Sequence, residues 1–388
     1  RFCQVSDGIV RKGKEKDMSE KQIKNMIANT FLDIADALET GSFGKKPVIG
    51  VAVAGTEHGM DNIYAGVKLA EKKGYKAVVI EGEDAHKQME KMLDAGEIQG
   101  AVTMHYPFPI GVSTVGRVVT PGMGKELYLA TTTGTSSTDR VESMVKNAVY
   151  GIIAAKASGV ENPTVGIANI DGARQTEIAL KKLKDNGYDI NFAESSRSDG
   201  GVVMRGNDLL EASADIMVMD ALTGNLMTKI FSAYTTGGSY ESLGYGYGPG
   251  IGEGYDKVVM IISRASGAPV IAGAIQYATE LLENKVLEVA AREFEAANKA
   301  GFAEILAEIR DSKKGGEAPK AVTAPPKEVV TYEIHGIEVI DLEDAAASLW
   351  EKGMYAETGM GCTGPVILVS DANAEAARKV LEEKGYIQ

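Results

Sequence analysis

The sequence predicts an α/β fold: a duplicated three-layer α/β/α core with a mixed, largely parallel sheet, followed by a small C-terminal α/β domain. From Pro47 onward, short β-branched runs alternate with helical stretches, which is typical of βαβ units. Two segments, Pro47–Ala52 and Pro163–Ala168, also open similar series, with Gly74-Tyr75 and Gly187-Tyr188 at matching places before the second strand. Any two βαβ units look alike in sequence, but matching Gly-Tyr dipeptides in the same order favour an internal duplication of the core. A duplicated core is expected to bind its ligand where the halves meet, at carboxyl ends of strands.

The expected elements follow from hydrophobic periodicity. Apolar residues at helical spacing predict an amphipathic helix over Glu20–Leu38 and further helices over Asp139–Ala157 and Gly273–Ile309. Short apolar runs predict the strands of the core, and a second set of runs predicts a module of an extended stretch, a helix, a strand and a helix. The core strands are Pro47–Ala52, Ala77–Ile80, Gly100–Met104, Pro163–Ala168, Asp189–Phe192, Ile216–Met219 and Val258–Ile262; the module comprises Val329–Ile340, Leu342–Glu351, Val366–Val369 and Ala372–Lys384.

These elements divide the chain into four parts. Residues 1–45 form an N-terminal helical segment, and residues 46–310 form the α/β core. Residues 311–328 contain three prolines and a Gly-Gly pair and are predicted to be a linker. Residues 329–388 form the small C-terminal domain, which could move relative to the core.

Composition excludes several function classes. The chain has 388 residues, 44% of them hydrophobic, and a net charge of −13 without a basic tract, which argues against nucleic acid and anionic membranes as partners. No apolar run approaches the ~20 residues of a membrane span, and no secretory leader is visible. The only cysteines, Cys3 and Cys362, exclude a disulfide framework and fit a reducing cytoplasm, where we expect the protein. The four histidines are scattered, so no metal site is expected.

Cys362 lies in the glycine-rich run Thr358–Pro365. Three glycines around one cysteine let the backbone curl, expose the sulfur and direct N–H groups toward a bound acyl group, which suits a nucleophilic thiol. Free cysteine is also among the most buried residue types, so the motif alone is equally compatible with a small apolar side chain in a turn. The run itself is predicted to be a loop.

Two turns that follow core strands are candidates for anion binding. Gly55 and Thr56 follow the first strand and precede a helix, whose N-terminal amides could hold an anion, and His58 is either a general acid/base or a solvated capping residue. Ser263 and Arg264 follow the strand Val258–Ile262. Arg264 could bind phosphate bidentately or form a surface salt bridge.

A third candidate, Leu222–Lys229, follows the last strand of the second half. In it Thr223 could contact phosphate, Asn225 could donate to an oxyanion, and Lys229 could pair with phosphate. The hydroxyl-rich run Thr131–Asp139 either cradles phosphate oxygens or is a polar connection with a helix cap. The run Gly237–Gly254, with eight glycines, is either a mobile lid or disordered padding.

Several of these segments together resemble the phosphate acyltransferases and, more distantly, the phosphate acetyltransferases. The matching pieces are Ala54–Gly59, Asn162–Ile170 and Asp220–Asn225, within Pro47–Leu282. Ser263-Arg264 departs from the His-Gly usual in phosphate acyltransferases and looks like the phosphate acetyltransferases. The resemblance implies a duplicated fold with a pseudo-dyad and favours Arg264 as the phosphate anchor.

With its tail Gly359-Met360-Gly361-Cys362-Thr363-Gly364-Pro365, the chain resembles the alpha subunits of component C of glycine/sarcosine/betaine reductase. That resemblance implies an acetyl thioester on Cys362, released by inorganic phosphate as acetyl phosphate, with Asn225 sharing the oxyanion and His58 as auxiliary donor. It implies phosphate contacts by Gly55, Thr56, Thr223, Lys229, Ser263 and Arg264.

The same resemblance implies a beta subunit and a selenoprotein carrier, protein A, as partners, and no tightly bound cofactor. A homo-oligomer is possible. Two rival functions stay open at this point. One is a phosphate acyltransferase that uses an acyl carrier protein, and the other is a non-catalytic scaffold subunit.

Overall fold

The computed structural model confirms the α/β fold with a large mixed, mostly parallel sheet and a small C-terminal domain. Apart from Phe31, the expected N-terminal helix lies outside the described residues, as do residues 315–323 of the expected linker. The structure describes Phe31 and residues 46–53, 55–82, 84–198, 200–314, 324–337, 341–361 and 364–387.

The main sheet of the described core has eleven strands in the order β2-β1-β3-β11-β10-β4-β5-β9-β6-β7, and β8 pairs with β6 beside this path. Most strands of the two outer parts are runs of Val, Ile and Ala, as expected for parallel strands covered on both faces. Their bounds are β1 Val48–Ala52, β2 Lys76–Ile80, β3 Gly100–Thr103, β4 Val112–Val119, β5 Glu126–Thr135, β6 Thr164–Ala168, β7 Asn191–Phe192, β8 Val203–Met204, β9 Ile216–Val218, β10 Gly248–Ile251 and β11 Val259–Ile261.

The strand order supports the internal duplication. In the first half β1 lies between β2 and β3, and in the second half β6 lies between β7 and β9, with parallel pairing throughout. Three antiparallel pairings, β11 with β10, β10 with β4 and β4 with β5, separate the halves. Because three reversals change the strand direction, the halves run in opposite directions. The carboxyl ends of β1 and β11 therefore lie at one edge of the sheet, and those of β6 and β9 at the other.

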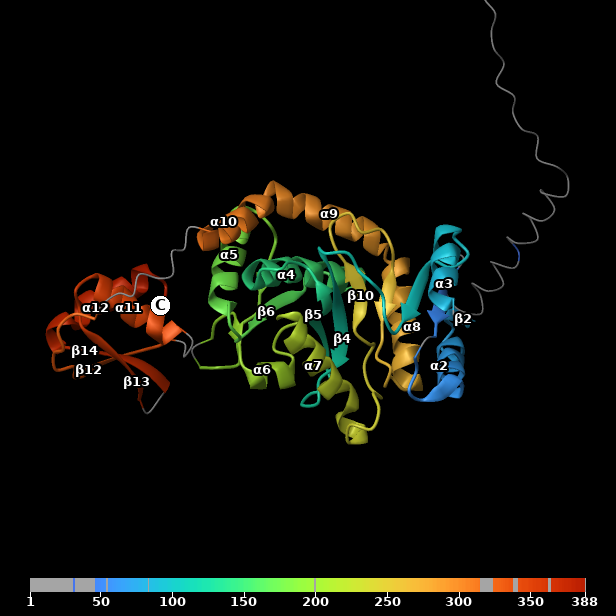
Figure 1. Ribbon diagram of the computed structural model, residues 1–388, viewed down its shortest axis with the longest axis horizontal. Coiled ribbons are helices and arrows are strands. Elements are labelled where there is room, and N and C mark those ends of the chain that lie inside the picture. The colour runs from blue at the N-terminus through green and yellow to red at the C-terminus, as the bar shows by residue number, and fades with distance from the viewer. Residues whose placement is uncertain are drawn as a thin grey trace, which may run out of the picture.

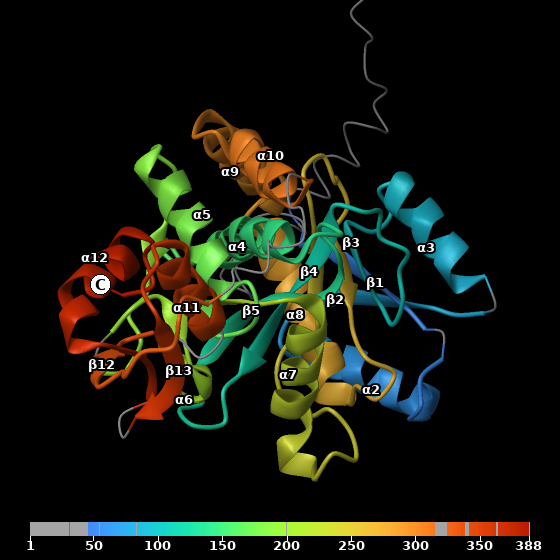
Figure 2. The ribbon, with the colours of Figure 1, turned by 60° about the vertical axis from the view of Figure 1, so that its left-hand side comes forward.

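Helices cover both faces of the sheet. Figure 2 shows α3 and α4 above the strands and α2 and α7 below them, with α9 and α10 outermost beyond α4. The expected helix Gly273–Ile309 is three helices, broken at Asn284-Lys285 and Ala300-Gly301. The core helices are α2 Gly59–Lys72, α3 Ala85–Asp94, α4 Arg140–Ala157, α5 Ala173–Asp185, α6 Gly206–Glu211, α7 Ala221–Ala233, α8 Ala268–Glu283, α9 Val286–Lys299 and α10 Phe302–Lys314. Within the described residues, no helix is both long and apolar enough to cross a membrane.

The central antiparallel strands are the main departure from the sequence prediction. The hydroxyl-rich run is only partly a connection: Thr131–Thr135 ends strand β5, with the side chains of Thr131 and Thr132 buried, while residues 136–139 lead to α4, which Asp139 caps as predicted. The glycine-rich run is not padding, because it contains the buried strand β10. Gly248 has φ +87°, and a Cβ there would lie 1.7 Å from the Val115 oxygen, so only glycine fits this close strand approach.

The C-terminal module has its own hydrophobic core. Its sheet has the order β12 (Tyr332–His335), β14 (Gly364–Val369) and β13 (Ala356–Gly361), and α11 (Leu342–Glu351) and α12 (Ala374–Glu383) pack on it. Thr358–Gly361, predicted to be a loop, instead ends β13, which pairs antiparallel with β14. Figure 1 shows the module beyond α5 and α6, at the end of the core away from α2. The linker is shorter than predicted, because α10 continues to Lys314.

Candidate functional site

Two turns from the first half of the sheet meet at one edge. The turn after β1 contains Gly55, and the loop after β11 contains Arg264. The Glu57 amide donates to the Arg264 carbonyl over 3.1 Å. Gly55 has φ +81°, and a Cβ there would lie 3.5 Å from Arg264 Nε, so the guanidinium lies directly against the backbone of the turn. β1 and β11 are parallel strands on either side of β3, so their carboxyl ends lie at the same edge of the sheet.

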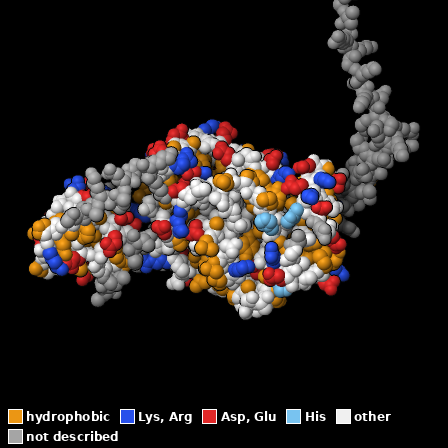
Figure 3. Space-filling view, in the orientation of Figure 1, with side chains coloured by type: hydrophobic (Ala, Val, Ile, Leu, Met, Phe, Trp, Pro, Cys, Tyr) orange, Lys and Arg blue, Asp and Glu red, His pale blue; other side chains and the backbone are white. Residues whose placement is uncertain are grey.

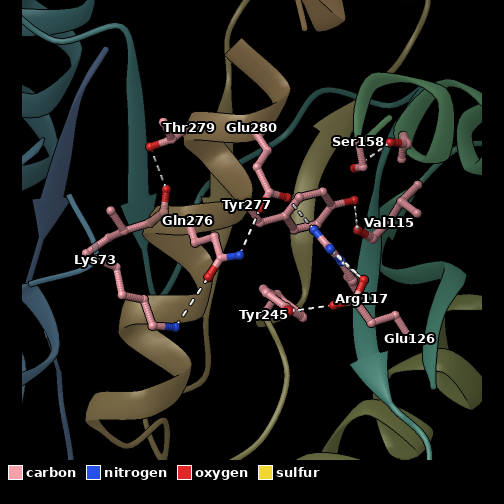
Figure 4. Close-up of polar contacts among 12 residues, drawn as sticks. Lys73, Val115, Arg117, Glu126, Ser158, Tyr245, Gln276, Tyr277, Thr279 and Glu280 are labelled. Carbon is pink, nitrogen blue, oxygen red and sulfur yellow. Dashed lines mark hydrogen bonds and ion pairs between the residues drawn. The ribbon is translucent and has the colours of Figure 1, made fainter. Parts of the chain in front are cut away.

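Arg264 is exposed, and its guanidinium makes no hydrogen bond or ion pair with any residue that the structure describes. Arg117, on the central strand β4, differs from Arg264 because its guanidinium is paired with two carboxylates. Its Nη1 lies 2.6 Å from Glu280 and its Nε 2.9 Å from Glu126, while the Tyr245 ring lies 4.1 Å away (Figure 4). Arg117 thus holds β4, β5 and α8 together, whereas Arg264 is available to an anion.

A second cation reaches this edge from the other half of the chain. Lys229 Nζ, on α7, lies 3.3 Å from Ser263 Oγ and 3.5 Å from Glu241 Oε1. α7 follows the carboxyl end of β9 at the opposite edge and packs along β5, so its later turns reach the loop after β11. In the space-filling view, basic side chains lie on the surface between α7 and α2 (Figure 3). Lys229 therefore contacts the loop that carries Arg264.

Glu241 is the residue of this region that sequence reasoning missed. Its side chain is 2% exposed and accepts hydrogen bonds from Tyr247 Oη (2.9 Å) and Ser266 Oγ (2.8 Å). Its backbone also bonds to the loop, since the Glu241 amide donates to Ala265 and the Gly267 amide donates to Glu241. An acidic residue inside a glycine-rich run gives no signal of burial. The burial of this run becomes visible only in the structure, where its strand β10 pairs with β11 and β4.

The remaining residues of the turn after β1 have local roles. His58 is the N-cap residue of α2; its ring is exposed and meets the Tyr240 ring edge-on, with 6.0 Å between the centroids. Thr56 Oγ1 accepts a weak hydrogen bond from the His58 amide over 3.3 Å. These contacts order the turn and leave the imidazole nitrogens of His58 without a hydrogen bond to the described residues.

The residues predicted on α7 do not all share one place. Asp220 caps the helix, and Thr223 is held in that cap because its amide and hydroxyl both donate to the Asp220 carboxylate. At a rise of about 1.5 Å per residue, Thr223 lies ~9 Å along the axis from Lys229, too far for one phosphate to contact both. Asn225 is one turn before Lys229 on the same face and is partly buried. The structure therefore brings Gly55, Lys229, Ser263 and Arg264 together, leaves Asn225 next to them and separates Thr223.

Cys362, with Thr363, lies outside the described residues. Gly361, the last residue of β13, pairs with Gly364, the first residue of β14. Figure 1 shows β13 far from α2 and α7. Among the described residues there is no cluster of three or more His, Cys, Asp or Glu side chains that could hold a metal ion.

Comparison with known proteins agrees with this architecture. The model of the family described as fatty acid synthesis protein matches residues 47–368. The chain is also similar to two proteins named phosphate acyltransferase: it is 27% identical to one from Bacillus licheniformis over 41% of this chain and 48% of that protein, and 26% identical to one from Caldicellulosiruptor saccharolyticus over 59% and 64%. These matches define a phosphate acyltransferase-like core.

A more specific relative covers nearly the whole chain. It is the glycine/sarcosine/betaine reductase complex component C subunit alpha of Peptoclostridium acidaminophilum, with 57% identity over 94% of this chain and 99% of that protein. The chain thus belongs to the fatty acid synthesis protein family and, within it, to the family of component C alpha subunits.

Proposed function

We propose that this chain forms acetyl phosphate from inorganic phosphate and an acetyl thioester carried on Cys362, as part of a glycine/sarcosine/betaine reductase complex. The observation that carries the proposal is the Arg264 guanidinium, exposed at a strand end, packed on Gly55 and without a partner among the described residues. A guanidinium of this kind suits a tetrahedral oxyanion because its planar N–H groups match two phosphate oxygens.

Phosphate would be held by Arg264, with Lys229 as a second cation and the Ser263 hydroxyl between them. Lys229 is half-exposed, so it can turn from Glu241 toward a bound anion while it stays near that carboxylate. Phosphate is already anionic near neutral pH, so the site needs to orient it more than to deprotonate it. No strong general base is required, and this explains why the site works without an ordered histidine: His58 serves at most as an auxiliary donor.

In the transfer step a phosphate oxygen attacks the thioester carbonyl carbon. A new C–O bond forms, the carbonyl π electrons move to oxygen, and the tetrahedral oxyanion is stabilised by N–H donors, including the Asn225 amide and backbone amides near Cys362. When the carbonyl re-forms, the C–S bond breaks and its electron pair leaves with sulfur as the Cys362 thiolate. A thiolate is a good leaving group, so no strong acid is needed.

The position of the module sets a condition on this proposal. The β13–β14 hairpin lies beyond α5, far from α2 and α7 (Figure 1). Arg264 lies against Gly55, in the turn before α2, and the neighbouring Ser263 contacts Lys229 of α7. The hairpin must therefore be repositioned to present a thioester to Arg264. The separate hydrophobic core of the module is consistent with movement as a unit, because the two units do not share buried apolar side chains.

The partners follow from the family. The relative from Peptoclostridium acidaminophilum is named as a subunit of a complex component, so this chain is proposed to act with a beta subunit. The acetyl group is proposed to reach Cys362 from a selenoprotein carrier. A longer-chain acyl donor on a carrier protein, as expected of a phosphate acyltransferase, is the alternative that the experiment must separate.

The test is arsenate-dependent breakdown of acetyl phosphate by the chain alone and by the isolated complex. Cys362→Ser is expected to abolish the reaction, and mass spectrometry is expected to find an acetyl adduct on Cys362. Cys3→Ser, which removes the other cysteine, serves as the control and should remain active. Equal rates in wild type and Cys362→Ser would remove the covalent step, and activity of Cys362→Ser with a fatty acyl carrier would favour the phosphate acyltransferase alternative.

A further inference from the structure

A cavity of about 230 Å³ separates the C-terminal module from the core. Its core side is formed by Arg174 and Glu177 of α5 and by Arg197, from the loop between β7 and β8. Its module side includes His335, at the end of β12, and Arg378 of α12. Figure 2 shows α11 and α12 on the side of the core where α5 and α6 lie. The cavity is thus a junction between two units that are each folded around their own core.

The charges in this cavity are mostly positive, although the chain carries a net charge of −13. Three guanidinium groups line it, against the carboxylates of Glu177 and Asp341. Glu177 is already paired twice, with Arg174 at 2.8 Å and with Lys181, which lies outside the lining, at 2.8 Å. Its charge is therefore compensated by side chains of its own helix and does not offset the arginines of the other elements.

A hydrogen bond joins the core to the module at this cavity. Arg174 Nη2 donates to the carbonyl oxygen of Gly385, at the end of the module. Arg378 is exposed and makes no hydrogen bond or ion pair with residues in the described ranges. Guanidinium groups that face one another across an interface repel, and the interface becomes favourable when an anion lies between them.

We propose that this cavity binds a small oxyanion of the phosphate class, which bridges Arg174 and Arg197 of the core to Arg378 of the module. The cavity is smaller than the ~300–1,000 Å³ of sites for drug-sized ligands, which suits orthophosphate or a small phosphate monoester. A guanidinium group can donate hydrogen bonds to two phosphate oxygens at once, and a phosphate has oxygens enough for side chains of both units to share it. This site is separate from Arg264 and does not depend on the proposed reaction.

The consequence concerns the position of the module. In the arrangement seen here β13 and β14 lie far from α2 and α7 (Figure 1). An anion in the cavity stabilises this arrangement, because it adds attraction that only the docked module can make. Occupancy of the cavity would therefore hold the module in its docked position, and loss of the anion would release it.

The experiment measures phosphate binding by calorimetry and the radius of gyration by small-angle X-ray scattering, on the full chain. Orthophosphate and glycerol 3-phosphate are used as separate probes, with chloride at matched ionic strength as the control. Arg378→Ala is expected to weaken one binding event about tenfold, as loss of a charge-assisted contact does, and to abolish the compaction that the anion produces. Lys379→Ala removes a neighbouring exposed charge of α12 that does not line the cavity, and it should behave as wild type.

Two outcomes would overturn the proposal. One is that Arg378→Ala binds both probes as wild type does, with an unchanged scattering response. The other is that Lys379→Ala loses as much binding as Arg378→Ala, which would show general charge attraction. The proposed reaction is tested separately by Arg264→Ala: if that variant retains all phosphate binding, the phosphate site of the proposed reaction is wrong, and the result for Arg378 is unaffected.

Discussion

The buried carboxylate of Glu241 accepts a hydrogen bond from Ser266 Oγ over 2.8 Å, and this contact joins the glycine-rich segment to the loop that carries Arg264. Ser266 Oγ also accepts from the Ser263 amide over 3.0 Å, so the start of the loop depends on the same hydroxyl. Tyr247, the residue before β10, hydrogen-bonds to Glu241, and Lys229 approaches it from α7. One carboxylate therefore sets the conformation of the proposed phosphate loop.

We expect Glu241→Ala to lower the free energy of unfolding by about 2 kcal/mol or more, because the hydroxyls of Ser266 and Tyr247 lose a buried acceptor. Glu241→Gln should cost less, since its amide oxygen still accepts one hydrogen bond. Urea denaturation followed by circular dichroism measures both. Glu288→Ala, an exposed glutamate on α9, is the control and should change stability little. If Glu241→Ala is as mild as Glu288→Ala, the network does not stabilise the loop.

Arg264→Ala is expected to lower kcat/KM for phosphate about a hundredfold, the usual effect of removing one donor from a preorganised oxyanion site. Arg264→Lys should recover part of this loss, because a lysine supplies the charge but not the two-pronged geometry. Steady-state rates of acetyl phosphate formation give the comparison. Arg292→Ala, which removes an exposed arginine of α9, should be indistinguishable from wild type. An Arg264→Ala variant with normal kcat/KM would show that phosphate binds elsewhere.

The sequence shows the outer strands better than the central ones, for a physical reason. Parallel strands buried on both faces are runs of Val and Ile, and β1, β6 and β9 were predicted within about two residues. The end of β5 is rich in threonine, which looks polar although its branched Cβ favours strands. β10 is the glycine-rich run Gly248–Ile251, whose composition suggests a turn.

The same limit applies to the site. Gly55 and Arg264 follow parallel strands, β1 and β11, which lie on either side of β3, so pattern reasoning places both residues at one edge of the sheet. The contribution of Lys229 depends on the path of α7 across β5, and that of Glu241 depends on burial. Local sequence marks Lys229 as a candidate cation but does not show that α7 carries it to the loop after β11, and it gives no sign that Glu241 is buried. Both depend on strand pairing between distant segments. The separation of Thr223 from Lys229 follows from helix geometry alone, since six residues span ~9 Å along the axis; the sequence does not show which end of α7 approaches the loop after β11.

The central strands also give a test that separates steric clash from backbone strain. Gly248→Ala is expected to cost about 3 kcal/mol or more, since its Cβ would lie 1.7 Å from the Val115 oxygen at φ +87°. Gly254→Ala has a similar φ of +74° with no atom within 4 Å of the added Cβ, so it should cost only ~1–2 kcal/mol. Denaturation midpoints measure the difference. Equal losses would mean that the strand approach is not as close as described.

Asp208 gives a prediction for acid stability. Burial raises the pKa of Asp208, but hydrogen bonds from the amides of Ser196 and Arg205 and from the Ser195 hydroxyl outweigh it and hold the pKa at about 2. A pKa below the unfolded value of ~3.9 means that the ionised form stabilises the fold by about 2 kcal/mol at neutral pH. That contribution is complete above pH ~4 and is lost as the pH falls toward ~2, where the folded protein is protonated as well.

Asp208→Asn should therefore be less stable than wild type at pH 7, and the difference in unfolding free energy should shrink as the pH falls from about 4 to about 2. Urea denaturation across this pH range measures it. Asp185→Asn, at an exposed carboxylate of α5, should give a small difference that does not depend on pH in this way. A gap between wild type and Asp208→Asn that stays constant down to pH ~2 would show that the carboxylate's hydrogen bonds, and not its charge, determine its contribution.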